Sequence, residues 1–228
     1  LKEERTELSR YFERTPFIPS NKIDREKRCD EILTIQAMGL KKRLAHTHCQ
    51  SAVVGISGGL DSTLAVLVTA RAFDMLKIPR ENIVCVTMPC FGTTDRTYSN
   101  AVTLTKKLGA SLREIRINKA VEQHFSDIGH DPEIHNVTYE NSQARERTQI
   151  LMDIANQTNG MVIGTGDMSE LALGWATYNG DHMSMYAVNC SVPKTLVRHL
   201  VRYYADTSEE QELKEVLLDI LDTPVSPE

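Results

Sequence analysis

A glycine-rich turn between two apolar runs carries the residues of this chain whose chemistry is easiest to read. The run at 53–56 ends in SGGLDST (57–63), and the helix-forming run LAVLVTARAF follows at once. This order predicts a strand, a tight turn and a helix N-terminus, whose main-chain amides and positive dipole end favour an anion. Gly58 and Gly59 have no Cβ, so phosphate oxygens can approach the main chain and a positive φ is tolerated.

Polar side chains complete this turn. The hydroxyls of Ser57, Ser62 and Thr63 add hydrogen-bond donors for an anion. The carboxylate of Asp61 would repel a phosphate. It is therefore expected to bind a magnesium ion that is itself bound to the phosphates. The turn is not a Walker A loop, because no lysine lies between Gly55 and Thr63. The alternative is an ordinary strand-to-helix turn capped by Asp61 or Ser62, but the sequence favours Mg-nucleotide binding.

A second polar string, YENSQARER (139–147), places two ligand-binding side chains on one face of a predicted helix. Asn141 and Arg145 are four residues apart. An asparagine can hydrogen-bond a neutral ligand group, and an arginine can grip a phosphate with two hydrogen bonds. The same spacing fits a solvated helix face on which Glu146 and Arg147 are surface charges.

A third string, GTGDMSELALGWATYNGD (164–181), follows a predicted strand. It lacks the last glycine of the dinucleotide fingerprint, so that motif is weak here. Glu170 either completes a magnesium site with Asp61 or is a helix-start carboxylate favoured by the dipole. Trp175 and Tyr178 are three residues apart, and they either stack on a flat ring or pack in the core.

Strands and helices are predicted to alternate along the chain. Apolar runs predict strands at 51–56, 83–88, 112–117 and 161–164, and helices are predicted at 33–44, 64–73, 98–108, 141–156 and 209–221. This alternation predicts an α/β fold with a doubly wound parallel sheet flanked by helices. Ligands bind such sheets at the carboxyl ends of the strands, so site residues are expected within 57–63, 89–95, 118–145 and 165–194.

The composition limits the class of protein. Of 228 residues, 41% are hydrophobic and 25% charged, which is ordinary for one globular domain. No apolar stretch approaches the length of a membrane helix. A net charge of −5 without a basic stripe argues against a nucleic-acid partner. Five scattered cysteines without a C-x-x-C pair fit a reducing cytoplasm. A polar loop is predicted around His124, His130 and His135, and the spacing of these histidines is too loose to favour a zinc site.

Several strings together resemble NAD synthetase. They are RTPFIP, SGGLDST, YENSQARER, TGDMSELALGWATYNGD and VPKT, and the likeness extends from about Arg14 to the end of the chain. The SGGLDS string by itself resembles the pyrophosphate loop of the N-type ATP pyrophosphatases. The resemblance implies the adenine nucleotide alpha hydrolase-like, Rossmann-like fold of that superfamily, and a homodimer.

The likeness is to the synthetase domain of the glutamine-dependent branch, whose members carry an amidase domain that acts as the glutaminase and supplies ammonia. By this resemblance, residues 1–28 are a linker or arm from a missing N-terminal amidase domain. Residues 29–228 are then the ATP-pyrophosphatase domain of NAD synthetase, truncated at its C-terminus.

The resemblance also implies roles for individual residues. Binding of ATP falls to Gly55, Ile56, Ser57, Gly58, Gly59, Leu60, Asp61, Ser62, Thr63, Arg145, Thr165 and Lys194. Asp61 and Glu170 are implied as ligands of Mg²⁺. Contacts with deamido-NAD fall to Asn141, Glu170, Trp175, Ala176, Thr177 and Tyr178. Asp61, Lys194 and Asp181 are implied as catalytic residues, and the position of Asp181 near the reacting centre suggests that it takes a proton from ammonium.

The implied activity is a ligase reaction of NAD biosynthesis. ATP adenylates the nicotinate carboxylate of nicotinic acid adenine dinucleotide (deamido-NAD), and ammonia then replaces AMP to give NAD. Activation is needed because a carboxylate is a poor electrophile at neutral pH. Two alternatives remain open: another ATP pyrophosphatase, such as GMP synthetase or a tRNA-modifying enzyme, or a nucleotide-binding domain that has lost catalysis. The acidic charge disfavours tRNA, and WATYNGD and YENSQAR disfavour GMP synthetase.

Overall fold

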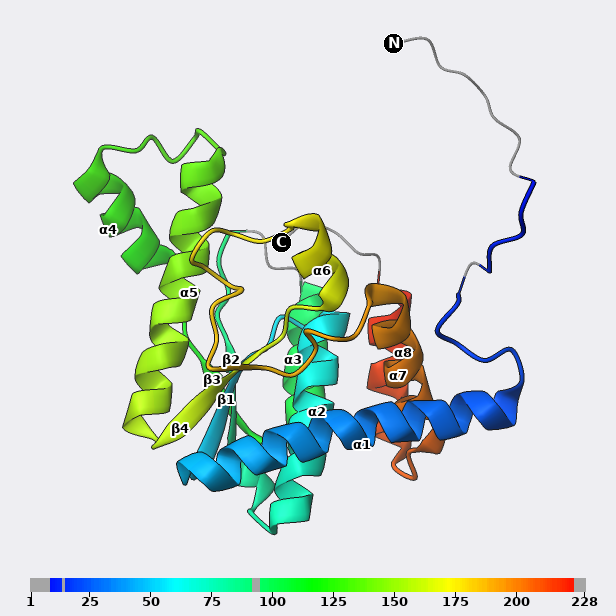
Figure 1. The fold of residues 1–228 in the computed structure, drawn as a ribbon. Helices are drawn as coiled ribbons and strands as arrows, with labels where there is room; N and C mark the ends of the chain where they lie inside the picture. Colours follow the sequence, from blue (N-terminus) through cyan, green and yellow to red (C-terminus); the bar gives the residue numbers. More distant parts are fainter. Residues whose placement is uncertain (1–8, 14, 92–94, 224–228) are drawn as a thin grey trace.

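The computed structural model describes residues 9–13, 15–91 and 95–223, and strands alternate with helices along it (Figure 1). The strands are β1 (Ser51–Gly55), β2 (Ile83–Thr87), β3 (Ser111–Glu114), β4 (Gly160–Gly164) and β5 (Tyr186–Ala187). The helices are α1 (Lys22–Thr47), α2 (Leu60–Leu76), α3 (Asp95–Lys107), α4 (Asn118–Ile128), α5 (Val137–Gln157), α6 (Met168–Leu173), α7 (Lys194–Thr207) and α8 (Gln211–Asp222), with a short 3-10 helix η1 (Arg80–Asn82) before β2.

The strands form one sheet in the order β3-β2-β1-β4-β5, and each neighbouring pair is parallel. From β1 the chain moves outward through β2 to β3, then crosses back to β4 on the other side of β1. The predicted doubly wound α/β sheet is therefore confirmed, and its switch point lies between β1 and β4. Loops that follow these two strands diverge there and leave room for a ligand.

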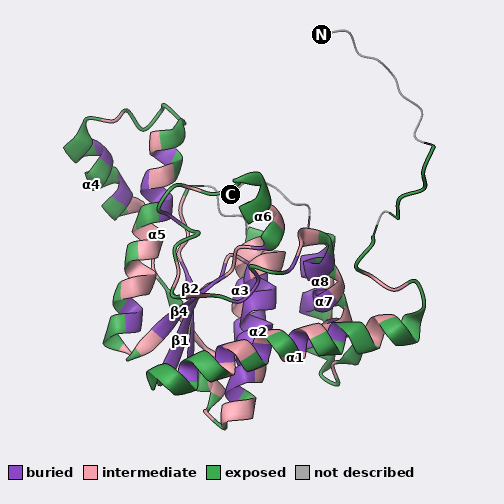
Figure 2. Cartoon of the chain, viewed as in Figure 1, coloured by how far each residue is buried: buried purple, intermediate pink, exposed green. Residues whose placement is uncertain are grey.

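Helices cover the two faces of the sheet unequally (Figure 1). Side chains of β1 alternate: Ala52 and Val54 join the core shared with α1, α2, α3, α7 and α8, whereas Val53 joins a smaller core under α5. Figure 2 shows β1, β2 and β4 and most of α2 as buried. Because β1 and α2 are both enclosed, the turn between them is held from two sides.

Several elements differ from the predictions. Helix α1 begins at Lys22, inside the stretch expected to be an arm, because the side chain of Asn21 caps its first turn. Helix α4 was not predicted; it buries only Val121 and Phe125 and is otherwise polar, so His124 lies on a helix instead of a loop. Strand β5 has two residues, too few to produce a pattern.

Among the residues that the structure describes, no helix combines the length and the apolar character that crossing a bilayer requires.

Candidate active site

Three carboxylates meet at the switch point of the sheet. Asp61 lies in the first turn of α2, just after β1, while Asp167 and Glu170 lie at the start of α6, just after β4. One oxygen atom from each side chain lies within 4.8 Å of the other two. In the part of the chain that the structure describes, no second group of three or more acidic, cysteine or histidine side chains is gathered in this way.

Lys194 reaches into this acidic cluster from the N-terminus of α7. Its Nζ atom lies 2.8 Å from Oδ2 of Asp167 and 3.3 Å from Oε1 of Glu170, and it contacts Oδ2 of Asp61. The main-chain amide of Lys194 donates to Oγ of Ser169, which fixes the start of α7 against α6. One ammonium therefore faces three carboxyl groups, so the cluster still attracts a further cation.

Burial perturbs the charges of this cluster. Desolvation raises the pKa of Asp61 to about 6, although its hydrogen bond and charge interaction with Lys194 act in the opposite direction. Burial also lowers the pKa of Lys194, but its interactions with Asp167 and Asp61 outweigh that effect and leave the pKa above its ordinary value. Paired shifts of this kind are typical of functional sites.

The free oxygen atoms of the cluster fit a divalent metal. Oδ1 of Asp61 is buried and accepts no hydrogen bond within the structure. A buried carboxylate oxygen without a partner is costly, and a hard cation would satisfy it. Carboxylate oxygens are the ligands that Mg²⁺ prefers in proteins. Asp61, Asp167 and Glu170 thus form a suitable set for that ion.

Helix α6 begins with a capping box that orients two of these carboxylates. Oδ1 of Asp167 accepts from the amide of Glu170 at 2.9 Å, and Oε2 of Glu170 accepts from the amide of Asp167 at 3.2 Å. Each side chain uses one oxygen in the cap and turns the other toward Lys194. The two readings of Glu170, helix-start carboxylate and cluster member, are therefore compatible.

The glycine turn has the shape that the sequence predicts. Gly58 has a φ of +86°, and a Cβ at this position would overlap the carbonyl oxygen of Thr97 in α3. Gly58 therefore allows both a positive φ and the close approach of α3. The turn ends at Gly59, which is the N-cap of α2 and has no side-chain cap, so capping by Asp61 or Ser62 is not observed.

Hydroxyl groups hold this turn in place. Oγ of Ser57 accepts from the amide of Gly59 at 3.2 Å, and the side chains of Ser62 and Thr63 donate to the carbonyl of Gly59 at 3.2 and 2.7 Å. Thr63 is fully buried. Its hydroxyl therefore shapes the turn from inside, and the main-chain amides at the start of α2 remain to face an anion.

Two arginines of α5 hold the segment that follows α6. Arg145 donates from Nε and Nη2 to the carbonyl oxygen of Tyr178, at 3.3 and 3.1 Å. Arg147 donates to both oxygens of Asp181, at 3.0 and 2.6 Å. Asn141, one turn before Arg145, is half-buried. These hydrogen bonds thus bring residues 139–147 and 164–181 together. Both stretches overlap the regions that were predicted to follow strands at the ligand-binding edge of the sheet.

The aromatic residues of that segment are exposed. Helix α6 ends at Leu173 because Gly174 takes a positive φ of 68° as its C-cap, so Trp175 and Tyr178 lie beyond the helix. Trp175 is 71% exposed and Tyr178 is 72% exposed. Neither ring therefore packs in the core, which was one of the two alternatives predicted for them. Oγ1 of Thr177 accepts from the amide of Asp181 at 3.1 Å, which fixes the turn between them.

Two site residues were not predicted from the sequence. Asp167 lies within the string 164–181 but was predicted to have no role of its own. The signal was present, because Asp167 and Glu170 have the spacing of a capping box directly after a strand. Asn189 is fully buried and bonds to the main chain of both site loops. A lone asparagine carries no signal of such a role.

Comparisons with known proteins agree with this geometry. Residues 32–211 match the family model described as NAD synthase. The chain is similar to the glutamine-dependent NAD(+) synthetase of Mycobacterium leprae (strain TN), with 45% identity over 227 residues, 97% of this chain and 33% of the relative. It is also similar to the NH(3)-dependent NAD(+) synthetase of Thermoplasma acidophilum, with 37% identity over 132 residues, 58% of this chain and 52% of the relative.

A solved structure supports the same relationship. The glutamine-dependent NAD+ synthetase from Acinetobacter baumannii, in complex with adenosine diphosphate, superposes with a TM-score of 0.76 at 27% identity. The match covers 83% of this chain and 36% of that chain. The present chain thus spans about a third of the length of these glutamine-dependent relatives.

Proposed function

This chain belongs to the NAD synthase family, and from that premise we propose that it adenylates deamido-NAD with ATP and amidates it to NAD. The observation that carries the proposal is the cluster of Asp61, Asp167, Glu170 and Lys194 beside the glycine turn. Its carboxylates can bind a metal ion that is also bound to phosphates, and its ammonium can pair with the phosphates. The turn presents main-chain amides to the same anion.

The first half-reaction makes a leaving group. A carboxylate oxygen of the nicotinate ring attacks the α-phosphorus of ATP, and the bond from that phosphorus to the α–β bridging oxygen breaks. Pyrophosphate leaves, held by the amides at the start of α2 and by Lys194, which face the charge that develops on the bridging oxygen. Mg²⁺ bound by Asp61, Asp167 and Glu170 would supply further neutralisation of the phosphate charge.

The second half-reaction forms the amide. Ammonia attacks the carbonyl carbon of the acyl adenylate, AMP leaves with the oxygen that joined it to the carbon, and one proton is released from the nitrogen. We propose that Asp181 takes the proton that converts ammonium to ammonia before this attack, for which its carboxylate must exchange a hydrogen bond from Arg147 for one from the nitrogen. In the proposed reaction, Asp61 and Lys194 hold the metal and phosphates.

The dinucleotide is proposed to lie along α5 and the segment after α6. Asn141 offers an amide, and the exposed ring of Trp175 or Tyr178 offers a flat surface for stacking. Ala176 and Thr177 complete that surface. Arg145 now holds the carbonyl of Tyr178, so a phosphate that Arg145 grips would release this segment and let it reshape around the substrate. Thr165 follows β4 and lies where the ATP is expected.

The proposal includes a partner and a compartment. The longer relatives are glutamine-dependent by name, and we propose that an amidase domain of the full protein supplies ammonia from glutamine and that the full protein is a homodimer. Among the described residues no two cysteines are joined in a disulfide, which fits the cytoplasm as a reducing compartment.

The test is release of pyrophosphate by this chain with Mg-ATP, deamido-NAD and ammonium, followed by detection of NAD. We expect release that depends on the dinucleotide and disappears in Asp61→Ala. A folded chain that neither releases pyrophosphate nor binds deamido-NAD by calorimetry would contradict the proposal. Release that depends on a different acceptor, such as xanthosine monophosphate, would move the chain to another ATP pyrophosphatase activity.

A further inference from the structure

Asn189 joins the two loops that carry the carboxylate cluster. Its side chain is fully buried, and Nδ2 donates to the carbonyl oxygen of Asp61 at 3.0 Å and to that of Thr165 at 2.9 Å. Asp61 lies at the start of α2, and Thr165 lies two residues before Asp167. One amide group therefore ties the loop after β1 to the loop after β4.

The orientation of this amide follows from its partners. Both acceptors are main-chain carbonyls, so the group that faces them must be the NH₂ of Asn189 and not its oxygen. Oδ1 then needs a donor, which is Nε2 of Gln36 in α1 at 3.2 Å; the same Nε2 donates to the carbonyl of Val188 at 2.8 Å. A chain of hydrogen bonds thus runs from α1 through Asn189 to the site.

This bridge lies where the sheet no longer holds the two loops together. The pairing of β1 with β4 runs from Ser51 opposite Gly160 to Val53 opposite Val162. Beyond that point the main chains separate toward Asp61 and Asp167. The side chain of Asn189 spans the separation. The amide of Val192 donates to the carbonyl of Asn189, which closes a turn two residues before Lys194.

We propose that Asn189 is a positioning residue: its amide, oriented by Gln36, sets the distance between Asp61 and the carboxylates of α6 and so fixes the metal site. The inference rests on the proposed function, because it assumes that the cluster binds a divalent metal. Loss of a group that orients metal ligands without contacting the metal commonly lowers metal affinity by about 10–100-fold.

The test is the affinity of this chain for Mn²⁺ alone, measured by electron paramagnetic resonance without nucleotide. Asn189→Leu keeps most of the volume and adds no charge, and we expect it to weaken Mn²⁺ binding by about tenfold or more. Gln36→Met removes only the orienting donor, and we expect a smaller loss of about threefold. The matched control is Ser51→Ala at the opposite end of β1, which removes hydrogen bonds to Thr158 without touching the cluster.

Urea unfolding of each variant separates positioning from simple loss of stability. The inference predicts weaker Mn²⁺ binding in both site variants, whereas Ser51→Ala loses stability at unchanged affinity. Unchanged Mn²⁺ affinity in a folded Asn189→Leu protein would overturn it. If Asn189→Leu does not fold, Gln36→Met decides in the same way. A parent chain whose Mn²⁺ binding is absent or is not lost in Asp61→Ala would overturn the proposed metal site itself.

Discussion

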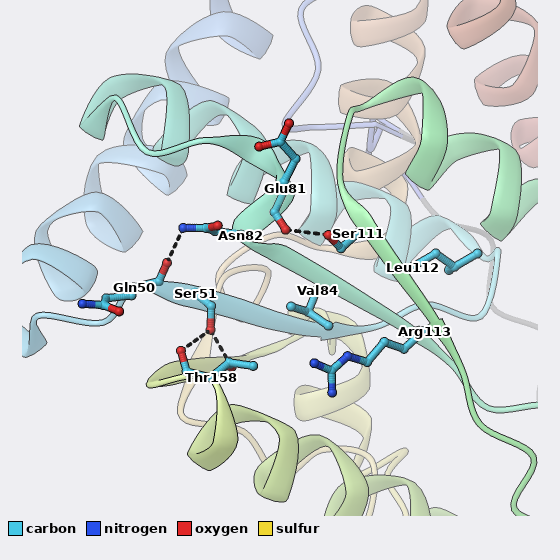
Figure 3. Close-up of a pocket in the computed structure, with 9 residues that line it drawn as sticks. All are labelled: Gln50, Ser51, Glu81, Asn82, Val84, Ser111, Leu112, Arg113 and Thr158. Carbon is cyan, nitrogen blue, oxygen red and sulfur yellow. Dashed lines mark hydrogen bonds between the residues drawn. The ribbon is translucent and has the colours of Figure 1, made fainter.

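The two ends of the sheet differ in how their polar groups are satisfied. At the amino ends of the strands lies a groove of about 390 Å³ lined by residues of β1, β2, β3 and η1 and by Gln50 and Thr158, most of them polar (Figure 3). Oγ of Ser51 pairs with Thr158, Nδ2 of Asn82 donates to the carbonyl of Gln50, and Oγ of Ser111 donates to the carbonyl of Glu81. These groups already have partners inside the protein.

At the carboxyl ends the balance is the opposite. Asp61 keeps a buried oxygen without a partner, and its pKa is raised to about 6 by burial. Three carboxyl groups face one ammonium there. The volume of a groove therefore does not identify the reactive end of this sheet. Unsatisfied charged groups identify the reactive end, because leaving them unpaired costs stability that a bound ligand can restore.

The largest expected difference between the two ends is in catalysis. We expect Asp61→Ala to lower the rate of pyrophosphate release at least about 100-fold, because it removes a ligand of the proposed metal. The control Ser51→Ala, at the amino end of β1, the strand that precedes Asp61, should stay within about twofold of the parent. Steady-state assays of both proteins under saturating Mg-ATP make the comparison. Equal losses in the two variants would show that the ends do not differ in function.

The next difference is in backbone strain. Gly58→Ala should lower the free energy of unfolding by about 3 kcal/mol or more, because the new Cβ meets a positive φ and the main chain of Thr97 together. Gly109, in the turn before β3 at the amino end, also has a positive φ but open space around it. Gly109→Ala should therefore cost only about 1–2 kcal/mol. Urea unfolding measures both, and equal costs would contradict the close packing of α3 on the turn.

The smallest effect concerns charges outside the cluster. Arg96 forms an exposed ion pair with Asp219, and hydrogen bonds from Arg96 and Asn100 hold the pKa of Asp219 below its ordinary value of 3.8. A lowered carboxyl pKa contributes stability above about pH 3.8, and that stability is lost as the pH falls through the folded-state pKa. Solvent screens the pair, so Asp219→Asn should cost under about 1 kcal/mol at pH 7.

Urea unfolding of Asp219→Asn and the parent between pH 7 and pH 3 checks this expectation. The difference between the two proteins should shrink as the pH falls. A difference of several kcal/mol, or one that grows toward low pH, would show that charge pairs away from the cluster carry more of the stability than we infer.

Much of this arrangement could be predicted from the sequence. The apolar runs of β1, β2 and β4 and the glycine turn at 57–63 have local causes, namely β-forming side chains and a φ that glycine permits. A shared metal site of Asp61 and Glu170 was one of two interpretations of Glu170 from the sequence, and the resemblance to NAD synthetase favoured it.

The remainder depends on contacts between distant segments. Asp167 has the local signature of a helix cap, and only the fold turns its second oxygen toward Lys194. The bridge made by Asn189 joins residues that are more than a hundred positions apart along the chain, so no local pattern announces it. Helices α4 and α7 and strand β5 were not predicted. Helix α4 buries only two side chains and β5 has two residues, whereas α7 has a regular apolar face that the prediction overlooked.

The most direct measurement is the position of Mn²⁺ in crystals of this chain grown with Mn²⁺ and a non-hydrolysable ATP analogue. We predict an anomalous scattering peak among Asp61, Asp167 and Glu170, with Lys194 turned from the carboxylates toward the phosphates and the analogue lying on the glycine turn. A nucleotide bound elsewhere, for example in the groove at the amino ends of the strands, or a peak away from these carboxylates, would contradict the assignment of the site.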